Sequence, residues 1–207
     1  MMNHRSFLLA ILMLSTVFML LGGCGTSNPS RFYLLSLSEE SEAAGQNRDG
    51  GLSIEIGPVK LPDYLDRLQI VVRTSRNELH MAEFDRWAEP LESNFIRVLA
   101  GNLSGLLSSN HITFFPGKAA VPTAYRVEVD VTRFEGGPDG TVTLDACWAL
   151  FKAEDNQLLL MKKSCIRKPA GEEEDYAALV SAKSDALGDL SREIAESITT
   201  QEAKVSE

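Results

Sequence analysis

Residues 125–132 read Tyr-Arg-Val-Glu-Val-Asp-Val-Thr, with an apolar side chain at every second position. Successive side chains of a β-strand point to opposite faces, so this alternation predicts a strand that buries one face. The next apolar segment, residues 142–150, carries its apolar side chains at the even positions. A turn through residues 135–140 predicts an antiparallel pair with Val129 opposite Ala146, so that both apolar faces meet one core.

Further strands are predicted on both sides of this pair. Residues 157–166 follow a turn and read as a third consecutive strand, and residues 69–74 and 78–83 read as a hairpin joined by Ser-Arg-Asn. Two earlier stretches rich in apolar residues predict strands at residues 31–37 and 52–56, with a loop over residues 38–51 between them.

Two segments have the periodicity of helices. Pro90 suits the first turn of a helix, and apolar side chains recur at helical spacing from Leu91 to Leu106. A second helix starts near Tyr176. The acidic residues 172–175 before it complement a helix dipole, which explains them better than a calcium site does. We therefore expect a two-layer α/β (α+β) domain, with a mostly antiparallel sheet and both helices packed on one face.

The beginning of the chain predicts where the domain is located. An apolar run over residues 7–21 ends in Leu21-Gly22-Gly23-Cys24. The run is shorter than the roughly 20 residues that span a bilayer, and its small last residues are typical of a cleaved signal peptide. Leucine, two small residues and cysteine resemble the bacterial lipobox, which predicts cleavage after Gly23 and a lipid on the thiol of Cys24. A plain secretory signal or an uncut signal anchor is the alternative.

These features divide the chain into a signal peptide (1–23), a tether (24–29), a single α/β domain (30–200) and a polar tail (201–207). Gly25, where retained lipoproteins carry Asp, indicates an outer-membrane protein facing the periplasm. The 29 acidic against 20 basic residues, a net charge of −9, argue against nucleic acid and against electrostatic adhesion to anionic lipids. The membrane contact is then expected to be the lipid itself.

Cys147 and Cys165 form an even pair in a compartment that permits disulfides. A turn centred on Asn156 places them opposite one another, near disulfide reach. The apolar residues 157–161 do not fix the register, and a slip of one residue puts the two cysteines on opposite faces. A disulfide and two buried free thiols are therefore both open.

The sequence contains no motif for catalysis or for metal binding. His80 and His111 are far apart in the sequence, and no cysteine cluster accompanies them. Residues 101–105 (Gly-Asn-Leu-Ser-Gly) lack the order of a nucleophile elbow, and no phosphate loop or dinucleotide fingerprint occurs. We expect neither an enzyme nor a bound cofactor or metal.

An ordered series of short motifs runs from the lipobox to about Ile198. They are residues 56–67 (IGPVKLPDYLDR), 69–73 (QIVVR), 84–91 (FDRWAEPL), 125–127 (YRV), 133–136 (RFEG), 144–146 (LDA) and 176–180 (YAALV). In this order they resemble the ABC-type transport auxiliary lipoprotein family, the PqiC (YmbA) group. Leu68, in place of an expected proline, and the cysteine pair depart from that pattern.

The resemblance implies an outer-membrane lipoprotein partnered with MCE-domain proteins, which build tubes across the periplasm for phospholipid or other hydrophobic cargo. The residues themselves indicate an acidic module that acts by binding. We expect it to dock such a tube through a surface that includes Arg86 and Trp87, and core packing of Trp87 is the alternative. A lipid carrier with its own cavity, a structural envelope-stress lipoprotein and a homo-oligomer stay open.

Overall fold

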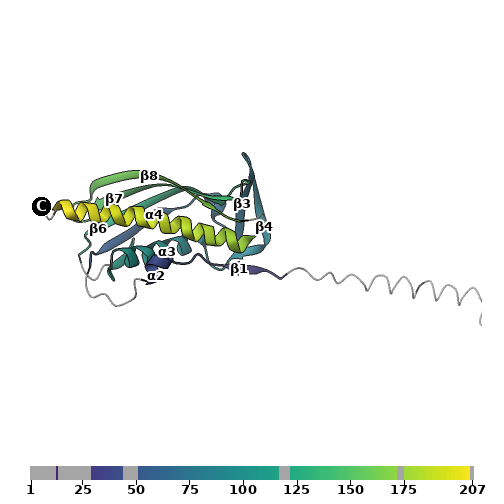
Figure 1. The fold of residues 1–207 in the computed structure, drawn as a ribbon, viewed down its shortest axis with the longest axis horizontal. Helices are drawn as coiled ribbons and strands as arrows, with labels where there is room; N and C mark the ends of the chain where they lie inside the picture. The colour runs from purple at the N-terminus through teal and green to yellow at the C-terminus, as the bar shows by residue number, and fades with distance from the viewer. Residues whose placement is uncertain (1–12, 14–28, 44–50, 117–121, 172–174, 206–207) are drawn as a thin grey trace, which may run out of the picture.

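The computed structural model describes residues 13, 29–43, 51–116, 122–171 and 175–205. The predicted signal peptide, apart from Met13, and the predicted lipid-bearing Cys24 lie outside these residues. Strand β6 (Tyr125–Gly136) is the centre of an eight-stranded sheet (Figure 1). It pairs antiparallel with β7 (Thr141–Lys152), which pairs antiparallel with β8 (Gln157–Pro169), as the alternation of apolar residues predicts.

The register of the central hairpin differs from the predicted one by two residues. Val129 lies opposite Trp148 rather than Ala146. The turn closes later than expected, with the Gly137 amide donating to the Thr141 carbonyl at 2.8 Å, and the register shifts again after Val131. From Tyr125 to Val131 the shift is two residues, which preserves the face of each side chain, so both apolar faces still meet one core.

The remaining strands make the sheet mixed. The predicted hairpin is confirmed as an antiparallel pair of β3 (Gln69–Ser75) and β4 (Glu78–Trp87). The other strands pair in parallel, β1 (Arg31–Tyr33) with β4, β2 (Ile54–Lys60) with the first half of β6, and β5 (Ile112–Phe114) with β2. The longest ladders are thus antiparallel, and the short N-terminal strands supply the parallel ones.

Two long helices lie on one face of the sheet (Figure 1). Both were predicted, and they are α3 (Leu91–Leu106) and α4 (Tyr176–Val205). The Asp175 carboxylate accepts the Ala178 amide at 3.0 Å and so caps the start of α4, whereas the acidic residues 172–174 lie outside the described residues. Residues 201–205 of the predicted polar tail are helical, because α4 continues to Val205.

The core between sheet and helices is filled by large side chains. Trp87, Phe95, Phe134 and Trp148 are all buried, and the Phe95 and Phe134 rings meet edge to face with centroids 5.5 Å apart. Such a pair adds about 0.5–1.5 kcal/mol to the burial of its surface. This packing fixes α3 against β6 and holds the helix layer in place.

Residues 34–43, here called the strap, connect β1 to the outer surface of the helices and contain the short helix α2 (Glu39–Ala43) within the predicted loop. Polar side chains of both helices hold its backbone. The amides of Leu35 and Ser38 donate to Asn94 Oδ1 and Asn102 Oδ1 of α3 at 2.7 and 2.9 Å. The Ser36 amide donates to Ser184 Oγ of α4 at 3.1 Å. The strap therefore ties the start of the domain to both helices.

Candidate binding site

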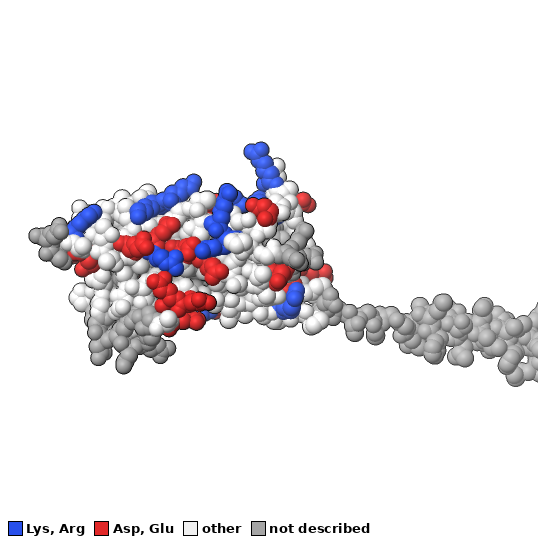
Figure 2. Space-filling model, viewed as in Figure 1, with Lys and Arg blue, Asp and Glu red and all other residues white. Residues whose placement is uncertain are grey.

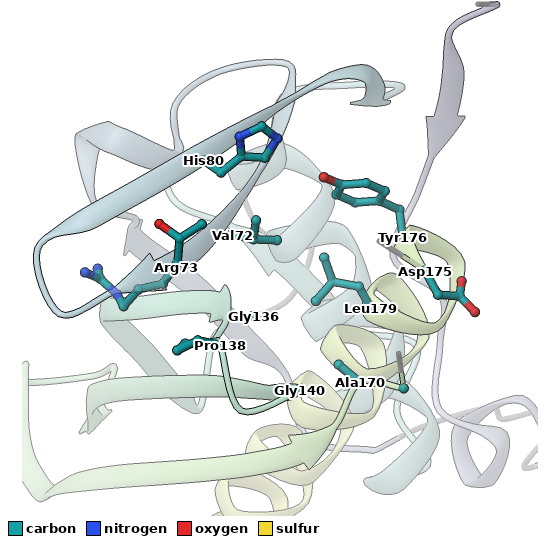
Figure 3. Close-up of a pocket in the computed structure, with 13 residues that line it drawn as sticks. Val72, Arg73, His80, Gly136, Pro138, Gly140, Ala170, Asp175, Tyr176 and Leu179 are labelled. Atoms are coloured by element: carbon teal, nitrogen blue, oxygen red, sulfur yellow. The ribbon is translucent and has the colours of Figure 1, made fainter. Parts of the chain in front are cut away.

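A surface pocket of about 510 Å³ lies at one end of the sheet, here called the β1 end (Figure 3). The β3–β4 hairpin, the turn between β6 and β7, and the first turn of α4 form its walls. Apolar side chains of Val72, Leu179 and Tyr176 line it together with the glycine-rich turn, and His80 and Arg73 stand on the hairpin side. A volume of this size is within the range of small-molecule sites, about 300–1,000 Å³.

Arg73 forms an ion pair with the buried carboxylate of Glu135. Its Nε lies 2.8 Å from Glu135 Oε1, and the Tyr64 hydroxyl donates to Glu135 Oε2 at 2.6 Å. Burial alone raises the pKa of Glu135, but the hydrogen bonds from Tyr64 and Arg73 outweigh it and hold that pKa below its usual value. Arg73 is thus a structural partner rather than a free cation of the pocket.

A second charge is buried beside Glu135. Lys183 of α4 has no exposed surface, and its ammonium donates to the Phe134 carbonyl at 2.8 Å. The Nζ atom also lies 5.2 Å from the centre of the Trp87 ring and 4.8 Å from that of Phe134. Burial lowers the pKa of Lys183 to about 7, and the charge of Glu135 offsets part of the fall.

Trp87 is a core residue, and its expected place at a partner surface is wrong. Its side chain is 2% exposed, because β4 continues to Trp87 and the alternation of the strand turns Trp87 inward with Asp85. Arg86, the residue between them, points to the outer side and is half-buried. Its Nη2 donates to the Glu83 carbonyl at 3.4 Å. Arg86 therefore remains available to a binding partner, whereas Trp87 does not.

Cys147 and Cys165 are free, so the predicted disulfide is wrong. The alternative of two free thiols holds, but both are exposed rather than buried. Cys147 lies opposite Lys163, and Cys165 lies opposite Asp145. The turn between β7 and β8 is centred between Glu154 and Asp155 rather than on Asn156. With the shift of one residue at Leu150, the two cysteines then take diagonal positions on one face. Diagonal partners are about 7–8 Å apart, beyond disulfide reach.

The site shows no constellation for chemistry. Over the described ranges, no group of three or more His, Cys, Asp or Glu side chains is placed to hold a metal ion. His80 and His111 do not come together, since His80 lies on the β3–β4 hairpin and His111 directly before β5. A search of the described helices for one long and apolar enough to cross a membrane finds none.

Lys183 is the residue that the sequence analysis missed, although the sequence contains a signal for it. It stands between Leu179 and Leu187, four residues from each, on the apolar stripe of α4. A lysine at that position of an otherwise apolar face indicates either a buried charge or a break in the stripe. The buried carboxylate that complements it lies on β6 and could not be assigned from spacing.

The comparisons with known proteins agree on one family. The family model described as "ABC-type transport auxiliary lipoprotein component" matches residues 33–195. The intermembrane transport lipoprotein PqiC of Escherichia coli (strain K12) is 28% identical over 130 residues, 63% of this chain and 68% of that protein. The PqiC protein of Shigella flexneri matches to the same extent.

Two crystal structures share the fold. One is of an uncharacterized protein, with a TM-score of 0.67, 23% identity, and coverage of 83% of this chain and 99% of that one. The other is of a protein from Xanthomonas campestris, with a TM-score of 0.65, 16% identity, and coverage of 86% of this chain and 100% of that one. At these sequence identities the structural similarity shows a shared fold and nothing about function.

Proposed function

Because the chain belongs to the ABC-type transport auxiliary lipoprotein family, we propose that it is an outer-membrane lipoprotein that docks an MCE-type intermembrane transport system by binding protein. The observation that carries the proposal is the family match over residues 33–195, together with a relative named as an intermembrane transport lipoprotein. The family match and this relative support a role in intermembrane transport. Docking at the outer membrane and an MCE-domain partner are what we propose in addition.

Action by binding agrees with the chemistry of the described side chains. The family is one of transport auxiliary lipoproteins rather than enzymes. Glu135 and Lys183, whose pKa values are shifted, are both buried in the core. The Lys183 ammonium contacts the Phe134 carbonyl and not the pocket. Neither group has an exposed surface from which it could contact a substrate.

Docking is favoured over carriage of lipid by the way the interior is filled. A carrier needs an apolar cavity large enough for an acyl chain. Here the space between sheet and helices is occupied by side chains such as Trp148 and Phe134, and the pocket at the β1 end is open at the surface with Arg73 and His80 on its wall. This arrangement supports a module that presents surfaces.

The anchor is part of the same proposal. Cys24 would carry the lipid, and Gly25 would release the protein to the outer membrane. Several acyl chains at about 0.8 kcal/mol per buried methylene make such an anchor stable. The chain then needs no helix that crosses the bilayer.

Affinity purification from a detergent-solubilised bacterial envelope tests the function. We expect the wild-type chain to fractionate with the outer membrane and to co-purify an MCE-domain protein, while Cys24→Ser leaves an uncut or soluble periplasmic protein. Outer-membrane fractionation of Cys24→Ser would show that the anchor assignment is wrong. A wild-type chain that captures no MCE component would favour the structural-lipoprotein alternative.

A further inference from the structure

Several large apolar side chains are exposed at the β1 end of the molecule. Phe32 of β1 is 63% exposed, Leu68 before β3 is 49% exposed, and Met81 of β4 is 42% exposed. Single exposed apolar residues are ordinary, whereas several that adjoin one another mark an interaction surface. The question is therefore whether these three are neighbours.

Strand register and backbone hydrogen bonds place Phe32 and Leu68 on neighbouring parts of the β1–β4–β3 sheet. Phe32 lies opposite Arg86, which lies opposite Gln69 of β3. The Trp87 amide, next to Arg86, donates to the Leu68 carbonyl at 2.6 Å. These contacts run from β1 across β4 to the start of β3, and the three strands form one side of the β1 end (Figure 1).

Arg67 extends the same surface to Met81. Its guanidinium lies against the methionine, with Nη1 2.9 Å from the Met81 sulfur. Over the described residues neither Arg67 nor Arg86 takes part in a salt bridge, and Arg86 Nε is buried without a partner. Phe32, Leu68, Met81, Arg67 and Arg86 are here called the anchor-side surface.

The charge of this surface is mixed rather than strongly basic. Asp66 and Glu83 are exposed acids next to it in sequence, whereas Asp85 is taken up by Arg31, whose Nε lies 2.8 Å from Asp85 Oδ1. The apolar side chains therefore contribute most of any attraction to a membrane. The two arginines suit the phosphate groups at its border, where long cationic side chains keep their heads in the polar layer.

The position of the surface in the chain indicates its partner. Apart from Met13, the described residues begin at Pro29, two positions before Arg31, so the anchor-side surface lies beside the first residues of the domain. Cys24 and Arg31 are seven positions apart in the sequence, and an extended chain of that length reaches at most about 25 Å. A lipid on Cys24 thus keeps this end of the domain close to the bilayer.

We propose that the anchor-side surface rests on the phospholipid surface in which the Cys24 lipid is inserted, with Phe32, Leu68 and Met81 at the level of the headgroups and Arg67 and Arg86 on lipid phosphates. This inference rests on the proposed lipid anchor. A membrane contact of this kind adds to the acyl chains a second point of attachment, and two points fix the orientation of the domain where one does not. The opposite end of the sheet then faces the periplasm.

Site-specific fluorescence in vesicles tests the contact. The full lipidated chain, with Cys147→Ser and Cys165→Ser, carries an NBD label at Phe32→Cys or, as the control, at Phe114→Cys. It is reconstituted into vesicles of phosphatidylethanolamine and phosphatidylglycerol that contain doxyl-labelled lipids. We expect the label at position 32 to be quenched by the lipid-borne doxyl groups and blue-shifted. The label at position 114 should be quenched only by aqueous iodide.

Two matched double variants test whether the membrane contact depends on the anchor-side surface or on any exposed apolar side chains. Leu68→Ser with Met81→Ser should remove most of the doxyl quenching at position 32. Leu158→Ser with Met161→Ser, the same residue types exposed on β8, should leave it unchanged. Equal quenching in the two double variants overturns the proposal.

The remaining outcomes are also decisive. A label at position 32 that is open to iodide in vesicle-bound protein overturns the contact, although the anchor stands. A label shielded from both quenchers shows that protein, not lipid, covers the surface, and likewise overturns it. If mass spectrometry finds no acyl groups on the chain and the chain does not insert into vesicles, the proposed lipid anchor is wrong. The proposed membrane contact is then wrong as well.

Discussion

At the residue scale, Lys183 is the most costly group in the core. Removing an ammonium from water costs several kcal/mol even after relaxation. The structure offsets this with the Phe134 carbonyl, the faces of two aromatic rings and the nearby carboxylate of Glu135. Because none of these partners is a direct carboxylate contact, the charge is only partly compensated, and its pKa falls to about 7.

This pKa makes the stability of the chain depend on pH. In the unfolded chain the pKa of Lys183 returns to its ordinary value of 10.5. Between pH 7 and 10.5 the unfolded chain binds more protons than the folded one, so the penalty of burial is full below pH 7 and is relieved as the pH rises. We predict that the free energy of unfolding of wild type rises relative to Lys183→Met by up to about 1.4 kcal/mol per pH unit above pH 7.

Urea unfolding of both proteins at pH 6, 7, 8 and 9 measures this difference. Lys162→Met is the control, because Lys162 also lies over a tryptophan ring, that of Trp148, but in an exposed position. A difference between wild type and Lys183→Met that stays constant from pH 7 to 9 would mean that Lys183 is not buried as a charge.

Trp87 shows what a sequence can and cannot decide for one side chain. A tryptophan among charged residues before a helix fits both an interface anchor and a core residue. The decision depends on where β4 ends. The strand was predicted to stop at residue 83, but it continues to Trp87, and its alternation then buries Asp85 and Trp87 and exposes Arg86.

At the scale of elements, the strap depends on two glycines of α3. A Cβ atom at Gly105 would lie 2.6 Å from the Cα of Ser41, so a methyl group there displaces strap backbone. A Cβ atom at Gly101 would meet only the far end of the Leu37 side chain, which can rotate away. Glycine to alanine in a helix otherwise stabilises by about 1 kcal/mol.

We therefore predict opposite signs for the two alanine variants. Gly105→Ala should lose about 1–3 kcal/mol from the displaced backbone, more than the helix gains, whereas Gly101→Ala should be neutral or slightly stabilising. Thermal unfolding of both against wild type measures this, and amide exchange of residues 35–41 reports on the strap itself. Equal melting temperatures for the two variants would contradict the packing of the strap on Gly105.

The elements that the sequence predicted well are those whose evidence is local. The strands β6 and β7 and the helices α3 and α4 follow from the spacing of apolar residues within each segment. Parallel pairing of β2 with β6 joins residues that are about 70 positions apart, and no local pattern reports it. The same limit affects register: the turn lies earlier than the predicted centre at Asn156, and the apolar residues 157–161 do not reveal this, so Cys147 and Cys165 are diagonal rather than opposite.

The candidate site was likewise predictable only where the evidence is local in the sequence. The resemblance in the sequence identified the family, and the family model over residues 33–195 confirms it. The buried Glu135 and Lys183, in contrast, are 48 residues apart and meet only because α4 packs on β6. Surfaces built from several strands, such as the anchor-side surface, appear only once the strands are arranged.

At the scale of the whole molecule, the domain has two distinct ends (Figure 1). The β1 end carries Pro29 and Ser30, the first described residues of the domain, and the anchor-side surface. The other end holds the last turns of α4 and the half of the sheet where β5 pairs with β2. Between them, acidic side chains gather over α4 and α2 on the helix face (Figure 2), which makes that face a poor partner for anionic lipid headgroups.

The difference between the two ends of the domain indicates where a periplasmic partner would bind. If the β1 end rests on the bilayer, a tube from the periplasm approaches the opposite half of the sheet. There β5 is the edge strand, and Phe114 and the following Phe115 are each 48% exposed. Among the described strands β5 has a neighbour on one side alone, and aromatic side chains beside such an edge are suited to hold a protein partner.

We predict that Phe114→Ser weakens capture of the transport partner while lipidation and folding are retained, because the side chain is exposed and its loss leaves the core intact. A true anchor residue contributes about 2 kcal/mol or more, which is roughly a 30-fold loss of affinity. Co-purification from solubilised envelope measures it, with Leu158→Ser on the opposite edge strand β8 as the control for an equally exposed apolar residue. Undiminished capture by Phe114→Ser, or an equal loss with Leu158→Ser, would move the docking surface away from the β5 edge.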